Sequence, residues 1–309
     1  MFSRLYQRLR YAPFLCQLVV TRRCNLACAY CSEFDHVSEV VPTDELKARI
    51  DEIAELGSFG CEFTGGEPLL HPDLMALVRH AAQYRFVMLG AITNGFLLTD
   101  AIVDGFNEAG LGELQISVDG VRPNEVTYKA LDVLRGRLER MAKRARFKVI
   151  LSAVIGTGVP REDIETIVRF ARDHGFRPRV LLRHGNDGQL APSGETLRPY
   201  ADVPRMIGVY HRDSIEYREQ MVERGESPFR CRAGSRYLYI DQEGVVHWCA
   251  QTAQSFGIPL HQYAAEDLRR QYYTYKPCNA RCTIGCARSC SLVDRWCPQP
   301  READDAGRL

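Results

Sequence analysis

A regular alternation of short apolar runs and amphipathic stretches fills the first two thirds of the chain and constrains its fold most strongly. The apolar runs, such as residues 14–20 and 146–156, are short and rich in branched side chains, as buried parallel strands are. The stretches between them have helical periodicity, and the one at residues 162–175 ends on a glycine suited to a helix C-terminus. Because parallel strands need crossover helices, the pattern predicts an α/β domain.

Six strands and five connecting helices are expected in this part of the chain. The strands are predicted at residues 14–20, 60–66, 85–95, 112–120, 146–156 and 177–185, and the helices at residues 44–57, 72–84, 99–110, 125–145 and 162–175. Functional residues of parallel sheets usually lie beyond the carboxyl ends of the strands. The residues that follow each apolar run are therefore the candidates for a functional site.

Three cysteines follow the first predicted strand. Cys24, Cys28 and Cys31 have the spacing CxxxCxxC, and Tyr30 precedes the last of them. Three thiolates this close together can hold three irons of a cubane cluster and leave the fourth iron open. The alternative is a zinc knuckle, but zinc needs four ligands, and His36 is the only nearby candidate for the fourth.

This motif, with an aromatic residue before its last cysteine, resembles the signature of the radical S-adenosylmethionine (SAM) enzymes. The resemblance implies a TIM-like partial (β/α)6 barrel with a [4Fe-4S] cluster at its mouth. It also implies that SAM binds the open iron through its amino and carboxylate groups. An electron from the cluster would then cleave SAM to a 5′-deoxyadenosyl radical, which abstracts hydrogen from the substrate.

Residues after the later strands fit the same resemblance. A GGEP sequence follows the second strand, and its glycines would let the backbone approach the amino group of SAM. Taken singly, the polar residues after the third and fourth strands are explained as well by turns or helix caps, and Val154 by the core. The SAM contacts implied by the resemblance are Tyr30, Gly65, Gly66, Glu67, Thr93, Asn94, Ser117, Asp119 and Val154.

The last third of the chain is rich in cysteine. Two of its cysteines bracket a predicted hairpin in a Cx12Gx4C frame, which resembles the SPASM extension of radical SAM enzymes. That resemblance implies one or two auxiliary [4Fe-4S] clusters, and a zinc ribbon is the alternative. The candidate ligands in this region are Cys231, Cys249, Cys278, Cys282, Cys286, Cys290 and Cys297.

Between residues 278 and 290 the cysteines recur every four residues, a spacing that departs from the Cx2Cx5Cx3C of the SPASM pattern. In one continuous helix the outermost pair would stand about 18 Å apart, too far for one cubane. Either turns break the run or the cysteines serve two clusters. The resemblance assigns Cys231, Cys249 and Cys290 to a first cluster and Cys278, Cys282, Cys286 and Cys297 to a second.

Composition limits the binding partners that the protein can have and the cellular compartment in which it can lie. The net charge is +1 over 309 residues, which gives no electrostatic footprint for nucleic acid. Neither a transmembrane run nor a secretory signal is recognisable, so we expect a cytoplasmic protein with reduced cysteines. Cys16 and Cys61 stand inside apolar runs and are expected in the core.

Three segments are expected along the chain: an N-terminal segment at 1–14, the barrel at 15–225 and the auxiliary-cluster domain at 226–309. The first ten residues have apolar side chains at helical spacing, which fits membrane contact or, more commonly, packing under the barrel. Residues 185–205 are predicted to form a loop that gates the barrel or simply connects, with a helix after it.

The activity implied is an oxidoreductase-type hydrogen abstraction from a peptide or small molecule, fed by a low-potential donor of the flavodoxin or ferredoxin type. A lipid-like or sugar substrate is one alternative. A non-catalytic iron–sulfur or zinc redox protein is another, although GGEP argues against it because such a protein has no use for a SAM pocket. The sequence assigns no catalytic acid or base, no substrate and no oligomeric state.

Overall fold

A computed structural model describes residues 10–31, 33–185, 220, 224–225, 227, 229–252 and 255–294. Strands and helices alternate through its first part as the sequence predicts. The elements there are β1 (Leu15–Thr21), α2 (Thr43–Glu55), β2 (Gly60–Gly65), η1 (Pro68–Leu70), α3 (Leu74–Ala82), β3 (Met88–Thr93), α4 (Asp100–Ala109), β4 (Glu113–Ser117), α5 (Leu131–Arg144), β5 (Lys148–Ile155), α6 (Arg161–Asp173) and β6 (Arg177–Leu182).

The second part continues the same sheet. Its elements are β7 (Tyr237–Ile240), β8 (Val245–His247), η4 (Ala250–Thr252), β9 (Ile258–Pro259), η5 (Leu260–Gln262), α10 (Ala265–Tyr273), η6 (Pro277–Arg281) and α11 (Gly285–Leu292). The predicted hairpin is confirmed, because β7 and β8 pair antiparallel with Tyr239 opposite His247. The first ten residues but Arg10, most of residues 185–224, and Cys297 lie outside the described residues, so the expectations placed on them stay predictions.

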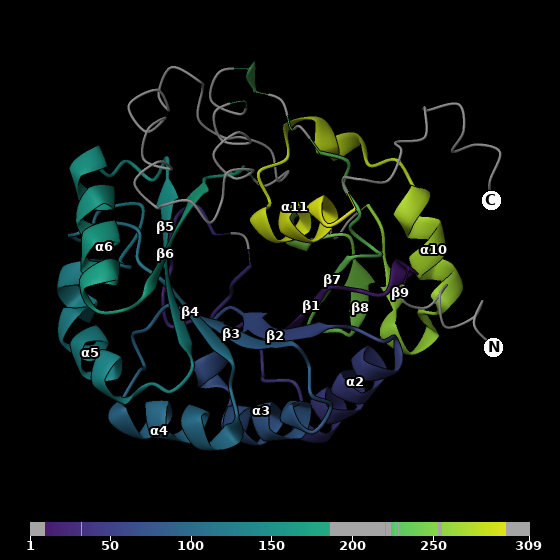
Figure 1. Cartoon of the computed structure of the whole chain (residues 1–309), viewed down its shortest axis with the longest axis horizontal. Coiled ribbons are helices and arrows are strands. Elements are labelled where there is room, and N and C mark those ends of the chain that lie inside the picture. Colours follow the sequence, from purple (N-terminus) through teal and green to yellow (C-terminus); the bar gives the residue numbers. More distant parts are fainter. Residues whose placement is uncertain are drawn as a thin grey trace.

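The sheet has the strand order β6-β5-β4-β3-β2-β1-β7-β8-β9. Strands β1 to β6 are parallel, and β7 adds in parallel to the free side of β1. Figure 1 shows α2 to α6 along the outer side of the curved sheet and α11 on its inner side. This is the predicted partial (β/α)6 barrel, with the cysteine-rich extension continuing its sheet.

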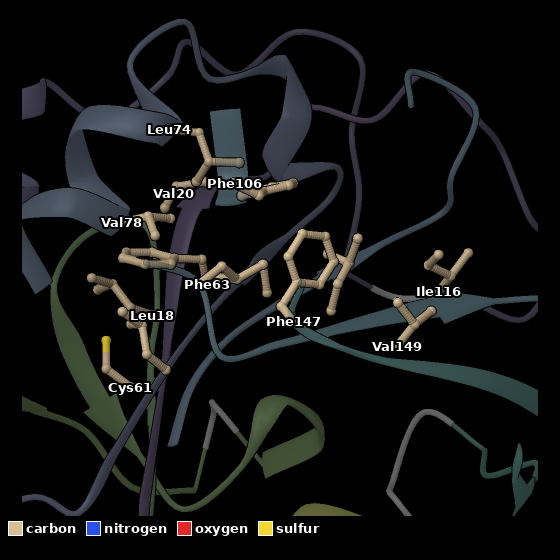
Figure 2. Close-up of a cluster of buried hydrophobic side chains, with 14 of the residues drawn as sticks. Leu18, Val20, Cys61, Phe63, Leu74, Val78, Phe106, Ile116, Phe147 and Val149 are labelled. Carbon is tan, nitrogen blue, oxygen red and sulfur yellow. The ribbon is translucent and has the colours of Figure 1, made fainter. Parts of the chain in front are cut away.

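The main core lies between the sheet and its outer helices. Figure 2 shows Phe63 of β2 packed with Leu18 of β1 and with Val78 of α3. Cys16 and Cys61 belong to the same cluster, and neither exposes any surface to solvent. Their prediction as core residues is therefore confirmed, and burial raises the pKa of the Cys16 thiol to about 12.

The helix predicted at residues 125–145 begins six residues later, at Leu131. The Asn124 side-chain oxygen accepts hydrogen bonds from the amides of Val126 and Thr127, which form an Asx turn in place of a helical turn. The amide of Asp119 then donates to the carbonyl of Lys129 at 2.7 Å. These bonds hold residues 124–130 as a loop over the carboxyl ends of the strands.

The run of cysteines near residue 280 is broken, as one of the two sequence alternatives required. The short helix η6 ends at Arg281 and α11 begins at Gly285, with extended backbone at Cys282 between them. A buried ion pair fixes this region to the barrel, because Arg236 Nε lies 2.6 Å from Asp294 Oδ2 and the Arg236 guanidinium also donates to the Ala12 carbonyl. Within the described part of the chain, no helix is long and apolar enough to cross a bilayer.

Candidate functional site

A cavity of about 190 Å³ opens at the carboxyl ends of β1 to β4. The residues that line it come from the loop after β1, from the ends of β2, β3 and β4, and from the loop before α5. They are Cys24, Leu26, Cys28, Cys31, Glu33, Phe34, Thr64, Gly65, Gly66, Ile92, Thr93, Asn94, Ser117 and Lys129. The three cysteines therefore share one cavity with most of the residues predicted after the later strands.

Backbone hydrogen bonds hold the cysteine loop in place. The Cys24 amide donates to the Asp35 carbonyl at 2.9 Å, and the Cys31 amide donates to the Cys28 carbonyl at 3.0 Å. The Ala29 amide donates to the Val126 carbonyl, which connects this loop to the loop before α5. The three thiols thus open into the cavity from a backbone that is already ordered.

Burial favours the neutral form of two of the three thiols. It raises the pKa of Cys24 and of Cys31, and the Lys129 ammonium opposes this effect at Cys31 without reversing it. No three His, Cys, Asp or Glu side chains converge as ligands of a single metal ion within the described residues. The thiolates of a cubane bind three different irons, so they need not converge on one point. His36 is occupied otherwise, since its Nδ1 lies 2.9 Å from the Cys24 carbonyl oxygen.

The glycine pair after β2 packs directly on the start of the cysteine loop. A Cβ at Gly65 would lie 2.1 Å from the Thr21 carbonyl oxygen, and Gly65 has φ +143°. A Cβ at Gly66 would lie 2.2 Å from the Arg22 carbonyl oxygen. Only glycine lets these two backbone segments approach so closely, and both glycines also line the cavity.

Glu67 braces the site from behind the cavity wall. Its carboxylate accepts hydrogen bonds from the Thr93 hydroxyl, the Asn94 amide and the Leu69 amide, at 2.7 to 3.0 Å. The side chain is fully buried, and burial raises the pKa of its carboxyl group. Glu67 therefore ties the turn after β2 to the end of β3 and positions Thr93 and Asn94, which do line the cavity.

A buried charged network supports the opposite side of the cavity. The fully buried Asp119 carboxylate accepts from the Tyr30 hydroxyl at 2.6 Å and from Thr127 Oγ1 at 2.9 Å, and it pairs with Lys129 Nζ at 3.2 Å. Lys129 also donates to the Tyr30 hydroxyl and lies over its ring. Burial opposes the charge of Lys129, but Asp119, Tyr30 and Cys28 offset it and raise its pKa well above the usual value. The network thus holds a fixed positive charge at the cavity wall.

Comparison with known proteins shows the family to which this chain belongs. A model of the Radical SAM superfamily matches residues 18–171, which include the cysteine loop, the glycine pair, Ser117 and Lys129. The chain belongs to the radical SAM superfamily of enzymes.

Curated relatives of this radical SAM enzyme have different reactions. It is 29% identical to GTP 3′,8-cyclase of Chlorobaculum tepidum over an aligned region of 201 residues. This region covers 63% of this chain and 61% of the relative. It is 39% identical to PqqA peptide cyclase of Bradyrhizobium diazoefficiens over an aligned region of 112 residues. This region covers 35% of this chain and 29% of the relative. The chain therefore spans less than two thirds of the length of these relatives.

Solved structures show the same fold at low sequence identity. Streptococcus suis SuiB bound to its precursor peptide SuiA has a TM-score of 0.65 at 14% identity, with 87% of this chain and 67% of SuiB covered. The structure of anSMEcpe with bound AdoMet has a TM-score of 0.58 at 15% identity, with 82% and 80% covered. These likenesses show that the barrel and the sheet extension of the radical SAM enzyme form a recurrent fold.

Most of the residues predicted as cofactor contacts line the cavity, and some do not. Of the predicted SAM contacts, Gly65, Gly66, Thr93, Asn94 and Ser117 line it, whereas Tyr30, Glu67, Asp119 and Val154 are absent from its wall. Tyr30, Glu67 and Asp119 instead hold other wall residues in place, and a direct contact of these four with SAM stays a prediction.

Sequence reasoning missed Lys129 and Glu33, which both line the cavity. Lys129 stands in a stretch that has helical periodicity, so its place in a loop was hidden. Glu33 accepts a hydrogen bond from Tyr239 of β7, a contact between residues far apart in the chain. In the sequence, the only sign that Glu33 lies at the site is its position two residues after the cysteine triplet.

The described cysteines of the extension are connected by charge effects and by apolar packing. Burial raises the pKa of the Cys282 thiol, and so do the charges of Cys231, Cys249 and Cys278. Cys290 responds to Cys286 and Cys16 instead, although it shares an apolar cluster with Cys231 and Cys249. Cys286 turns toward the barrel interior, where Gln17 Nε2 lies 3.5 Å from its sulfur. Charge effects thus connect Cys282 to Cys231, Cys249 and Cys278, and packing connects Cys290 to Cys231 and Cys249. The predicted division of the cysteines between two clusters stays a prediction, since Cys297 lies outside the described residues.

Two buried basic side chains act on Cys231. Arg232 and Lys276 are almost fully buried, and both lower the pKa of the Cys231 thiol against the larger opposite effect of burial. Burial also lowers the pKa of Lys276 to about 7, so Arg232 is the fixed positive charge of the two. The Arg232 guanidinium lies 4.0 Å from the centre of the Tyr272 ring. A positive surrounding of this kind stabilises thiolates and the negative charge of an iron–sulfur cluster.

Replacing Gly66 by alanine should damage the site. The new Cβ would collide with two carbonyl oxygens of the cysteine loop, at 2.2 and 2.4 Å, so the loop or the turn must move. We expect the thermal midpoint to fall and 5′-deoxyadenosine formation to drop by about tenfold or more. The control is Gly136→Ala in the exposed part of α5, where the nearest atom lies 3.8 Å from the new Cβ. Equal behaviour of the two variants would contradict the close packing at Gly66.

Proposed function

We propose that this radical SAM enzyme binds a [4Fe-4S] cluster on Cys24, Cys28 and Cys31 and binds SAM in the cavity beside it. The observation that supports this most strongly is the convergence of three thiols from one loop with a fixed cation, Lys129, in the same cavity. When bound and reduced, the cluster and SAM supply a 5′-deoxyadenosyl radical that takes a hydrogen atom from the substrate.

The residues of the wall suit the groups of SAM. The Lys129 ammonium, held by Asp119, offers a positive partner for a carboxylate. The backbone at Thr64 and Gly65 can approach an amino group because no side chain stands at Gly65 and Gly66. Ser117 and Asn94 add polar groups for the ribose or the carboxylate, and Asn94 is fixed by its bond to Asn25 at 2.7 Å. Val154 stays a proposed contact of the adenine.

Spectroscopy of the anaerobically reconstituted enzyme tests this proposal. The electron paramagnetic resonance signal of the reduced cluster should change when SAM is added, because SAM would bind the open iron. 5′-Deoxyadenosine, which lacks the amino and carboxylate groups that would bind the open iron, serves as the control for a non-specific effect. An unchanged signal with SAM would refute the proposed site.

We further propose that Cys231, Cys249, Cys278 and Cys282 hold an auxiliary [4Fe-4S] cluster. The charge effects of Cys231, Cys249 and Cys278 on Cys282, and the effect of the buried Arg232 on Cys231, support it. Iron analysis of the reconstituted chain should then give about eight irons, four for each cubane. About four irons would exclude an auxiliary cluster, and about twelve would favour the two-cluster division that includes Cys286, Cys290 and Cys297.

A peptide or a small molecule is the proposed substrate. A relative named PqqA peptide cyclase and the solved complex of SuiB with a precursor peptide support a peptide, whereas the GTP 3′,8-cyclases support a small molecule. A cytoplasmic location and a low-potential donor of the flavodoxin or ferredoxin type are part of the same proposal. Incubation with either donor should sustain 5′-deoxyadenosine formation, and failure with both, where dithionite succeeds, would exclude these donors.

A further inference from the structure

Arg179 points to the inner side of the barrel. Along β6 the residues Pro178, Val180 and Leu182 are buried, and the last two belong to the core that packs on the outer helices. Side chains alternate along a strand, so Arg179 lies on the opposite, inner face. Its guanidinium donates to Gln115 Oε1 of β4 at 2.6 Å, which confirms that it reaches across the inner side of β5.

The register connects Arg179 to the cavity. Arg179 pairs with Ser152 of β5, and Ser152 pairs with Ser117 of β4, which lines the cavity. Neighbouring strands stand about 4.8 Å apart, so the backbones of Arg179 and Ser117 are about 10 Å apart in the same row. A small substrate, or one side chain of a peptide, can span this distance.

The guanidinium has no carboxylate partner among the described residues. It donates hydrogen bonds to the neutral Gln115 oxygen and to the Cys286 sulfur, the latter at 3.9 Å. The charges of Glu62 and Glu113 act on Arg179 and help to raise its pKa, but among the described residues no carboxylate oxygen lies within 4.0 Å of the guanidinium. The Glu62 carboxylate instead accepts a hydrogen bond from Gln17 Nε2 at 2.6 Å. An arginine is always charged, and a charge withdrawn from water is stabilised when a bidentate oxyanion binds it.

The start of α11 adds positive potential at the same place. A Cβ at Gly285, its first residue, would lie 3.1 Å from an Arg179 Nη atom, so the guanidinium sits directly against the first turn. No side chain caps this helix. The positive end of a helix and a guanidinium repel each other, and an anion between them would offset that repulsion.

We infer that Arg179 binds an oxyanion of the substrate, a carboxylate or a phosphate, and so orients the substrate below the SAM cavity. The inference rests on the proposed function, since it takes the barrel interior as the substrate site. It assigns Arg179 to substrate specificity and gives it no part in the cleavage of SAM. A substrate with an acidic group is therefore favoured over a neutral lipid-like one.

Anion binding to the reconstituted full-length enzyme tests this. Glutarate and inorganic phosphate are titrated separately at constant ionic strength and followed by calorimetry and ligand-observed NMR. We expect the wild type to bind one of them, and Arg179→Gln to weaken that binding about tenfold or more, because a charge-assisted bidentate contact is lost. The preference between the two probes distinguishes a carboxylate from a phosphate.

Two further variants keep the result decisive. Arg177→Gln, an exposed position on the same strand, should bind like the wild type. Arg179→Lys keeps the charge but loses the fork geometry, and should show weakened binding even if Arg179→Gln does not fold. Binding of neither anion by the wild type, or equal binding by wild type and Arg179→Lys, would overturn the inference. SAM cleavage by the wild type is measured in parallel. If the wild type does not cleave SAM, that result counts against the proposed function and not against the role of Arg179.

Discussion

A variant in which Cys24, Cys28 and Cys31 are all replaced by alanine is expected to form no detectable 5′-deoxyadenosine. The three thiols line the one cavity that also holds Lys129, and without them the described part of that loop has no thiolate to hold a cluster. The loop itself should persist, because its hydrogen bonds run through the backbone. The measurement is product formation by chromatography, together with iron content and circular dichroism.

The matched control removes a cysteine that the cavity does not use. Cys16→Ala lies in the fully buried core on β1 and should cost about 1 kcal/mol of unfolding free energy while SAM cleavage persists. Retention of 5′-deoxyadenosine formation in the triple variant would refute the assignment of the cluster. Its loss in Cys16→Ala without unfolding would show that the assay does not separate the two sites.

Replacing Asp119 by alanine is expected to have the largest effect of any single substitution at the site. Lys129 exposes 13% of its side chain, and its carboxylate partner is completely buried. Removal of one member of a buried ion pair costs about 3 to 5 kcal/mol, because the remaining charge is left without compensation. The loss also frees the Tyr30 and Thr127 hydroxyls, so Lys129 would no longer be fixed at the cavity wall.

Urea unfolding and SAM binding measure the two consequences of Asp119→Ala. We expect a fall of about 3 kcal/mol in unfolding free energy and weaker binding of SAM. Asp100→Ala is the control, because Asp100 pairs with Arg140 in a half-exposed setting and should change stability far less. Similar losses for both variants would mean that the Asp119 network carries no special role.

The sequence predicted the strand-end motifs because each is local. The triplet of cysteines and the glycine pair are recognisable from spacing, and both indeed stand at the ends of neighbouring strands. Lys129 was hidden because the stretch before it has helical periodicity. Its position depends on a hydrogen bond that the Asn124 side-chain oxygen accepts and on one that the Asp119 amide donates, which no periodicity reveals.

Roles were harder to predict than places. The contact of Glu67 with SAM stays a prediction, and the three hydrogen bonds that its two oxygens accept give it a positioning role that the GGEP sequence alone does not reveal. The placement of the cysteines in the extension depends on where the chain turns between η6 and α11, and on the position of α11 inside the curved sheet (Figure 1). Both are tertiary features, so spacing alone cannot assign these cysteines to clusters.

The pairing of β7 with β1 lets the extension protect one edge of the barrel sheet. It covers what would otherwise be a bare edge of the sheet, and the Gln242 side chain accepts a hydrogen bond from the Arg22 amide just before the cysteine loop. A chain truncated after residue 225 would expose that edge to other copies of itself, since uncovered strands readily pair with one another. We therefore expect an enzyme shortened to its barrel to aggregate and not to be a usable minimal catalyst.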